Sequence, residues 1–248
     1  MKDLSIQRAS EQEIESFRSL FLHESNVYFV HNKCHQYGWA DSWIFSLQKE
    51  KIGYGAVWGS DKREIKNCIF EFYLLRPYRR SATDIFEAFI EASGASFLEC
   101  QTNIPLLSLM FYEFGKNIKV EAILFKDHYQ TNLTVPGAVF QKKDFTSDHP
   151  QEIAGLVIEY EGREVASGGF FLNYNFPYAD IYMSVEESQF QKGFGSLIVQ
   201  EIKKEIYKMG RVPSARCNVT NYISKSTLMK AGFEPCGALM TAAVRIDR

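Results

Sequence analysis

The chain has 248 residues and a formal net charge of -2, with 46% hydrophobic and 15% aromatic residues. This composition can bury a core and lies far from that of disordered chains. The near-neutral charge excludes a general attraction to nucleic acid. No apolar run approaches the roughly 20 residues that a membrane span needs, and the first residues lack the apolar stretch of a signal peptide. Five scattered cysteines are typical of reduced thiols, so we expect a cytoplasmic protein without membrane or nucleic-acid partners.

The first half of the chain alternates strand and helix patterns, which is typical of an α/β fold. Ser10 stands at capping-box spacing from Glu13, directly before an amphipathic segment, and this predicts the start of a helix. Glycines end the two later helical segments, at Gly94 and Gly115. The predicted strands are 4–9, 42–47, 52–58, 68–75, 96–100 and 120–125, and the predicted helices are 10–23, 83–92 and 105–114.

The second half follows the segment 133–148, which is polar, contains Pro136 and Gly137, and is interpreted as a connector or an edge segment. A hairpin, a helix–strand pair and a short helix follow it. The predicted strands are 153–160, 164–172, 180–185, 214–218 and 239–246, and the predicted helices are 195–209 and 224–230. Lys203 and Lys204 are expected on the solvent side of the first of these helices.

The two halves repeat one pattern, in which a strand is followed by Thr-Asn and then by a helix. Thr102 and Asn103 occupy these positions in the first half, and Thr220 and Asn221 occupy them about 118 residues later. We interpret this as an internal duplication. It predicts two domains, residues 1–134 and 135–248.

A turn with two glycines opens the helix of the second half. Residues 190–196 read Phe-Gln-Lys-Gly-Phe-Gly-Ser and follow a predicted strand. Gly193 and Gly195 allow a sharp turn and leave no Cβ in the way of a ligand. Unpaired N–H groups at the helix start then favour a phosphate, helped by the helix dipole. Residues 76–82 stand at the same place in the first half and contain no glycine, so the phosphate site is predicted in the second half alone.

From residue 164 to 233 the chain resembles the GNAT superfamily, the acetyl-CoA-dependent N-acetyltransferases. The strand and glycine turn resemble the phosphate turn of the family, and Asn221 followed by Gly232 and Phe233 resembles its later motif. The first half resembles the family through the duplication, which implies a tandem protein with a degenerate N-terminal copy. The implied fold is α/β, with two GNAT-like halves that are each a mixed, mostly antiparallel sheet flanked by helices.

The resemblance also implies that acetyl-CoA is the co-substrate and that no metal takes part. In the family, the strand backbone pairs with the pantetheine arm, and this role falls on Met183 and Val185. An N–H near Met183 would stabilise the oxyanion, and Asn221 would bind the arm from the opposite side. The implied coenzyme-binding residues are Met183, Val185, Gln191, Lys192, Gly193, Phe194, Gly195, Ser196, Asn221 and Ser224.

The acceptor is expected to be a small-molecule or peptide amine, with its identity left open. Residues 173–180 are dense in aromatic and polar side chains and are expected to border the acceptor cleft. Asp180 and Glu186 are the candidate general bases, and Met183 is the third candidate catalytic residue through its backbone. The alternative is that Asp180 caps its loop and that Glu186 is solvated. GNAT proteins are often dimers, so a homodimer is compatible with the resemblance.

The chain departs from the family at two positions. Phe190 stands at the head of the phosphate turn, where the family usually has Arg or Gln, and Leu228 stands where many members have a tyrosine that protonates the leaving thiolate. The predicted function is an N-acetyltransferase that moves acetyl from acetyl-CoA to a primary amine by direct attack. The alternatives are a non-catalytic acyl-CoA-binding sensor or scaffold, and a tandem acyltransferase with a larger donor.

His31, Cys34 and His35 form a dense run of metal-ligand residue types. A metal site needs three or four ligands in a defined geometry, and no second cluster lies close to this run in the sequence. We therefore predict no metal site there. Cys217 is expected to point into the core rather than to act as a nucleophile.

Overall fold

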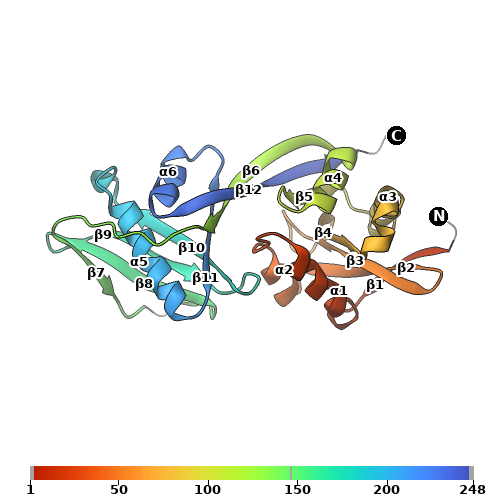
Figure 1. The fold of residues 1–248 in the computed structure, drawn as a ribbon, viewed down its shortest axis with the longest axis horizontal. Helices are drawn as coiled ribbons and strands as arrows, with labels where there is room; N and C mark the ends of the chain where they lie inside the picture. Colours follow the sequence, from red (N-terminus) through yellow and green to blue (C-terminus); the bar gives the residue numbers. More distant parts are fainter. Residues whose placement is uncertain (1–2, 146, 246–248) are drawn as a thin grey trace. The chain divides into compact units, whose positions relative to one another are not determined.

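A computed structural model of the chain describes residues 3–145 and 147–245 (Figure 1). The helices are α1 (Glu11–Glu24), α2 (Asn32–Gln36), η1 (Arg76–Ser81), α3 (Ala82–Ser93), α4 (Pro105–Phe114), η2 (Glu187–Gln189), α5 (Phe194–Lys208) and α6 (Tyr222–Lys230). The strands are β1 (Leu4–Ala9), β2 (Ala40–Leu47), β3 (Glu50–Trp58), β4 (Cys68–Leu74), β5 (Phe97–Gln101), β6 (Gly115–Asp127), β7 (Ala138–Lys142), β8 (Glu152–Tyr160), β9 (Arg163–Phe171), β10 (Tyr178–Val185), β11 (Val212–Asn218) and β12 (Phe233–Val244).

The chain folds into two compact units that are not consecutive segments. Unit 1 holds the residues up to Tyr28, Lys33–Glu121 and the residues from Gly237 onward. Unit 2 holds Phe29–Asn32 and Ala122–Cys236. The division therefore differs from the single boundary after residue 134 that the duplication suggests, because β6 and β12 each pass from one unit into the other.

Unit 1 is a mixed sheet in the order β1-β2-β3-β4-β5-β12. Its neighbours are antiparallel except β4 and β5, which are parallel at Cys68 and Ile69. Residues 239–243 of β12 pair with β5, so the last strand of the sequence completes the sheet of this unit. Ile246, the expected end of that strand, lies outside the described residues. Buried aromatic side chains of α3 and α4, among them Phe86, fill the core.

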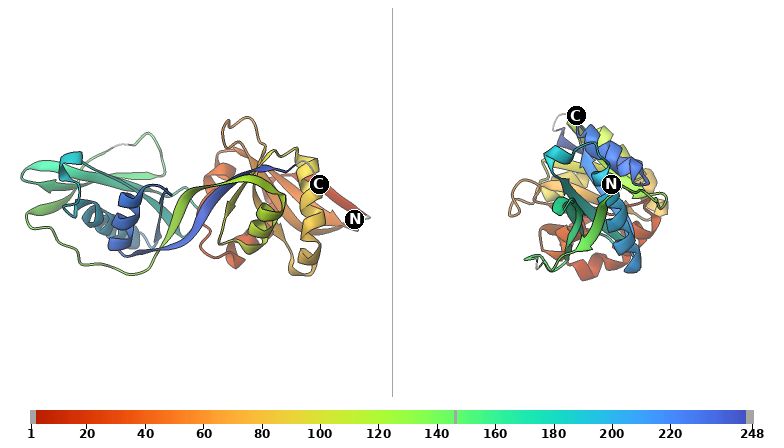
Figure 2. Two further views of the ribbon diagram at one scale, coloured as in Figure 1. Left: turned by 90° about the horizontal axis from the view of Figure 1, so that it is seen from above. Right: turned by 90° about the vertical axis from the view of Figure 1, so that its left-hand side faces the viewer.

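Unit 2 is a mixed sheet in the order β6-β11-β10-β9-β8-β7. Adjacent strands are antiparallel, except that β10 and β11 are parallel. The segment interpreted as a connector or edge contains β7, which lies at the edge of this sheet. Helices α5 and α6 lie on the same face of the sheet, as Figure 2 shows, and Ile198, Ile202 and Ile206 of α5 are fully buried against it.

The structure confirms the expected α/β fold, in which each unit has a mixed, mostly antiparallel arrangement of strands flanked by helices. Ser10 and Glu13 form the capping box that predicts the start of α1, and α4 has the expected bounds. The strand expected at 120–125 begins earlier, at Gly115. The sequence pattern does not predict α2, because a five-residue helix is too short to show a periodicity. Within the described residues, no helix is long and apolar enough to cross a membrane.

Candidate functional site

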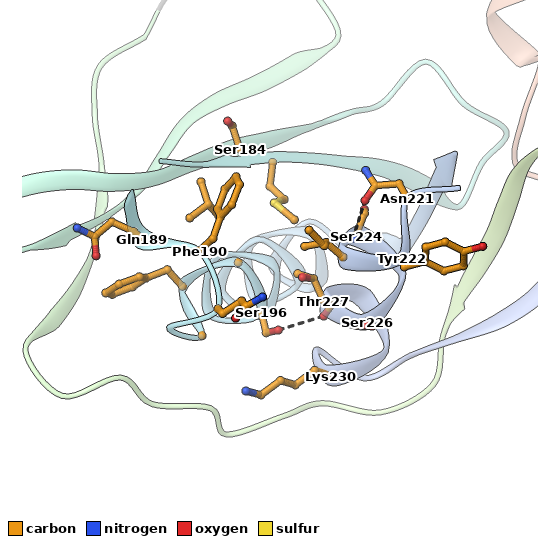
Figure 3. A pocket seen from close by; sticks show the side chains of 17 residues that line it. Ser184, Gln189, Phe190, Ser196, Asn221, Tyr222, Ser224, Ser226, Thr227 and Lys230 are labelled. Atoms are coloured by element: carbon orange, nitrogen blue, oxygen red, sulfur yellow. Dashed lines mark hydrogen bonds between the residues drawn. The ribbon is translucent and has the colours of Figure 1, made fainter. Parts of the chain in front are cut away.

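A pocket of about 710 Å³ lies in unit 2, between β10, the first turn of α5 and one side of α6. Figure 3 shows the side chains that line it. The lining residues are 183–185, 189–191, 193–196, 221–224, 226, 227 and 230. The pocket therefore joins the end of a strand, the glycine turn and the Asn221 helix, three segments that the sequence analysis singles out separately.

The pocket opens where two parallel strands separate. Strand β10 pairs with β11 only from Tyr178 to Asp180, although β10 continues to Val185. On its other edge β10 stays paired with β9 as far as Val185, and the N–H of Glu186 donates to the carbonyl of Val165 at 3.0 Å. Alternate residues of a strand direct their backbone groups the same way. The N–H groups of Met183 and Val185 therefore point to the edge that β11 has left.

The glycine turn shapes the other wall of the pocket. Gly193 is the N-cap of α5 with φ of 93° and has no side chain to cap the helix. The N–H groups of the first turn of a helix have no intrahelical acceptor. No acidic residue lies in this turn, so no carboxylate of the turn competes with a ligand for these N–H groups. A Cβ at Gly195 would stand 3.1 Å from Cγ2 of Thr227, so a side chain here would push against α6 and the close approach of α5 and α6 favours glycine.

Asn221 is the N-cap of α6. Its Oδ1 accepts a hydrogen bond from the N–H of Ser224 at 2.9 Å. The amide oxygen therefore caps the start of α6. The amide nitrogen then lies on the pocket side, and Figure 3 shows it directed toward β10. Asn221 thus offers a donor across the pocket from the strand backbone of Met183.

The structure brings together most of the predicted coenzyme-binding residues. Those that line the pocket are Met183, Val185, Gln191, Gly193, Phe194, Gly195, Ser196, Asn221 and Ser224. Lys192 is not among the lining residues, and its Nζ donates to Oε1 of Gln189 at 3.0 Å. The turn therefore presents its backbone to the pocket and directs this cation elsewhere.

The two candidate bases lie outside the pocket lining. Asp180 is buried, and its Oδ2 lies 3.5 Å from Nε of Arg216. Nη2 of Arg216 donates to the hydroxyl of Tyr174 at 2.6 Å, so Asp180 belongs to a polar group at the point where β10 and β11 separate. Glu186 is exposed just beyond the end of β10.

The segment between β6 and β7 runs along α5 and ends beside the glycine turn. Oε1 of Gln200 accepts the N–H of Leu133 at 2.6 Å, and a Cβ at Gly193 would meet Cγ2 of Val135 at 3.3 Å. Figure 1 shows this segment crossing α5. It holds the start of α5 in place, which is where the pocket needs a fixed backbone.

The same segment explains why Lys203 is buried, against the expectation that it faces solvent. Its side chain is 2% exposed. Its Nζ lies 2.7 Å from Oδ1 of Asp127 and donates to the carbonyls of Tyr129 at 2.8 Å and Ala231 at 2.9 Å. The ammonium thus joins α5 to the end of α6 and to the segment after β6. The expectation is wrong because the helix pattern does not reveal which chain segment covers it.

Unit 1 has no equivalent of the glycine turn. The 3-10 helix η1 occupies the place between β4 and α3. Asn103, the counterpart of Asn221, donates from Nδ2 to the carbonyls of Asn26 and, at 3.4 Å, of Val27. The amide of Asn103 is therefore used by the protein's own backbone.

Unit 1 instead buries a charged cluster around Glu71, which is 0% exposed. Its carboxylate accepts from Tyr54 at 2.9 Å and lies 2.9 Å from Nε2 of His35. Nη2 of Arg18 lies at 3.4 Å. Burial alone would raise the pKa of the Glu71 carboxyl, but Arg18 and His35 outweigh it and hold that pKa well below its usual range. His35, from the run of metal-ligand residue types, thus contacts the Glu71 carboxylate, and no group of three or more His, Cys, Asp or Glu that could hold a metal ion occurs in 3–145 and 147–245.

Sequence reasoning also misses pocket residues on α6. Thr227 and Lys230 line the pocket and are three positions apart, which places them on one face of the helix. Thr227 is three positions after the predicted coenzyme-binding residue Ser224, and Lys230 is four positions after Ser226. This helical spacing is the signal in the sequence that could have identified both residues. Tyr222 lines the rim, but Figure 3 shows its ring directed away from the pocket interior.

The comparisons with known proteins give one family and several related structures. The sequence model described as the acetyltransferase (GNAT) domain matches residues 10–128, most of which belong to unit 1, whereas the glycine turn lies in unit 2. No curated protein matches the chain.

Three solved structures share the fold over nearly the whole chain. An acetyltransferase from the GNAT family from Colwellia psychrerythraea has a TM-score of 0.75 at 14% identity, covering 97% of this chain and 100% of that one. A tandem GNAT protein from the clavulanic acid biosynthesis pathway has a TM-score of 0.62 at 9% identity, covering 99% and 100%. A GCN5-related N-acetyltransferase from Sphaerobacter thermophilus has a TM-score of 0.61 at 9% identity, covering 100% and 98%.

Proposed function

We propose that unit 2 is an N-acetyltransferase, because residues 10–128 match the acetyltransferase (GNAT) domain model and the whole chain shares its fold with GNAT structures, one of them a tandem GNAT protein. It would move an acetyl group from acetyl-CoA to a primary amine. The observation that carries the proposal is the pocket, which combines an unpaired strand edge, a helix start without acidic residues and the amide of Asn221. These are the partners that a pyrophosphate and an amide-bearing arm require.

The residues of the pocket offer the kinds of partner that coenzyme A needs. The pyrophosphate would accept hydrogen bonds from the backbone at Gly193–Ser196, where a Cβ at Gly195 would crowd Thr227 at 3.1 Å. The pantetheine amides would pair with the free edge of β10 at Met183 and Val185, as an added strand does. Asn221 would donate from the opposite side. The coenzyme supplies an acetyl group activated as a thioester.

The proposed reaction is a direct attack of the amine on the thioester carbonyl. The N–H of Met183 faces the unpaired edge of β10 and would donate to the oxyanion that forms. Removal of one such donor in other enzymes lowers kcat about 10²- to 10³-fold. A covalent intermediate on Cys217 is disfavoured, because burial raises the pKa of its thiol and keeps it protonated.

Proton transfer is the least defined part of the proposal. Asp180 lies at the separation of β10 and β11, beside Arg216, and would take the amine proton through water. Glu186 is the exposed alternative at the end of the same strand. Leu228 is buried where a tyrosine often stands in the family, so the leaving thiolate would accept a hydrogen bond from Ser224, which lines the pocket.

A second candidate function is a non-catalytic acyl-CoA sensor. Phe190 lines the pocket at the head of the phosphate turn and is 46% exposed, and the phenol expected at Leu228 is missing. Both features are compatible with a protein that binds the coenzyme without turnover.

Thiol release from acetyl-CoA distinguishes the two. We would screen a polyamine, an aminoglycoside, free amino acids and an N-terminal peptide as acceptors, after calorimetry has measured acetyl-CoA binding. Amine-dependent release that falls in Asp180→Asn, with acetyl-CoA affinity unchanged, supports the enzyme. Binding without release from any acceptor supports the sensor, and preferred binding of longer acyl-CoAs supports a transferase with a larger donor. The absence of any binding would overturn the proposal.

A further inference from the structure

The second half of the chain repeats the elements of the first half, with one exception. The order β1, β2, β3, β4, η1, α3, β5, α4, β6 recurs as β7, β8, β9, β10, η2, α5, β11, α6, β12. Helices α1 and α2 lie between β1 and β2, whereas the described residues between β7 and β8, 143–145 and 147–151, contain no helix. The second copy therefore lacks the helical connection that the first copy has between its first two strands.

Part of that helical connection belongs to unit 2. The four residues Phe29–Asn32, at the junction of α1 and α2, are in unit 2, although their neighbours on both sides are in unit 1. Phe29, Val30 and His31 are each at most 3% exposed, and the ring centroid of Phe29 lies 5.8 Å from that of Tyr178. His31 has φ of 81°, a conformation that a residue other than glycine keeps only where its surroundings hold it. The segment Phe29–Asn32 is therefore an ordered, buried part of unit 2.

Asn175 binds this segment with both its backbone and its side chain. Its N–H donates to the carbonyl of Phe29 at 3.1 Å, and its Nδ2 donates to the carbonyl of Val30 at 3.0 Å. Asn175 is buried, and a buried carbonyl that loses its donor is costly. The loop before β10 is thus fixed by a segment that lies 145 residues earlier in the sequence.

The same loop contacts the proposed base. Tyr174, next to Asn175, is buried, and Cζ of Arg216 lies 5.4 Å from the centroid of its ring. The hydroxyl of Tyr174 accepts the hydrogen bond from Nη2 of Arg216, and Nε of Arg216 lies 3.5 Å from Oδ2 of Asp180. One series of contacts within unit 2 therefore connects the segment Phe29–Asn32 to Asp180.

We propose that the segment Phe29–Asn32 completes the acceptor side of the unit 2 site and that Asn175 is its positioning residue. By holding the loop, the segment keeps Tyr174 and Arg216 beside Asp180. The inference rests on the proposed function, in which Asp180 takes the proton of the amine. The effect is confined to the acceptor, because neither the segment nor Asn175 lines the coenzyme pocket. The first half of the sequence thus supplies a piece that the second copy lacks.

The test removes the hold on the loop from either side. Asn175→Ala deletes one of the two donors to the segment, and Phe29→Leu shortens the buried ring of the segment. Asn103→Ala is the matched control, because the same kind of side-chain amide donates to the carbonyls of Asn26 and Val27, just before the segment and within unit 1. Hydrogen–deuterium exchange over residues 172–179 measures the hold, calorimetry measures acetyl-CoA affinity, and thiol release with the amines of the screen gives kcat and KM for the acceptor.

Both variants are expected to speed exchange over residues 173–178 by about two- to tenfold, the range that the loss of one hydrogen bond gives. The kcat/KM for the amine should fall about tenfold or more, because a small misplacement of groups at a reacting centre has a large effect on rate. Acetyl-CoA affinity should stay unchanged, and Asn103→Ala should alter neither the exchange nor the amine kinetics. Phe29→Leu keeps most of the buried volume, so it tests the inference even if Asn175→Ala does not fold.

Three results would overturn the inference. Faster exchange with unchanged amine kinetics would show that the segment only stabilises the loop, and unchanged exchange in both variants would show that it does not hold the loop. An equal loss of acetyl-CoA affinity and amine kinetics would show that the substitutions damage unit 2 as a whole. If the wild type releases no thiol with any amine, the proposed function itself fails, and this outcome is distinct because it precedes any effect of a substitution.

Discussion

Replacing Gly193 by glutamate is expected to weaken acetyl-CoA binding while the chain stays folded. Gly193 has φ of 93° at the N-cap of α5, and a Cβ there would stand 3.3 Å from Cγ2 of Val135. A residue other than glycine in the left-handed region costs roughly 1–2 kcal/mol, which lowers stability without preventing folding. The contact with Val135 needs an adjustment of a few tenths of an ångström.

The loss of binding comes from charge and space rather than from stability. A carboxylate at the N-cap would compete for the helix N–H groups and would stand beside the pyrophosphate. Two like charges about 4 Å apart repel by roughly 1–4 kcal/mol at the effective dielectric constants of a protein surface. The expected weakening is therefore from about fivefold to several hundredfold.

Gly210→Glu is the matched control. Gly210 also has a positive φ, of 67°, and has no atom within 4 Å of an added Cβ. It follows the opposite end of α5, away from the pocket. Calorimetry gives the acetyl-CoA affinity, and urea unfolding gives the stability. Both variants should lose similar stability, and only Gly193→Glu should lose affinity. Wild-type affinity in Gly193→Glu, or an equal loss in both variants, would refute the phosphate cradle.

Three further outcomes are expected. Asn103→Ala should lower the free energy of unfolding by about 1 kcal/mol and leave the acetyl-CoA affinity unchanged in calorimetry. Asn221→Ala should weaken the acetyl-CoA affinity. A loss of affinity in both variants would contradict the assignment of the site to unit 2. Lys203→Met should destabilise the chain by about 3–5 kcal/mol in urea unfolding, because Oδ1 of Asp127 and two carbonyls lose their partner, and a change under 1 kcal/mol would contradict the buried ion pair. The depressed pKa of Glu71 contributes stability that is present above the unfolded pKa of about 4.5 and is lost as the pH falls. The stability difference between wild type and Glu71→Gln should therefore be large at pH 7 and shrink at pH 3, and a constant difference would show that the charge of Glu71 does not matter.

The sequence identified the parts of the site that depend on local backbone chemistry. The turn between strand and helix uses Gly193 for a positive φ and Gly195 for the close approach of α5 and α6. A glycine is recognisable in the sequence at each of these positions. Asn221 is recognisable because capping residues have strong positional preferences. Capping, periodicity and turn residues likewise predicted most helices and strands, since each acts over a few neighbouring positions.

Contacts between distant segments were decided by the tertiary structure. The pattern of β12 marks it as a strand, but only the pairing with β5 shows that it completes unit 1. Lys203 follows the helix pattern of a solvent-facing residue, yet the segment after β6 covers it. Glu71 and His35 come together from separate elements.

By itself, then, the sequence determined the α/β elements, the glycine turn and the resemblance to the GNAT superfamily. The tertiary structure decided that Lys230 faces the pocket, that Lys192 does not, and that Asn103 is used by its own unit. The physical reason is that backbone conformation is a local property, whereas burial and ion pairing depend on segments that lie far apart in the chain.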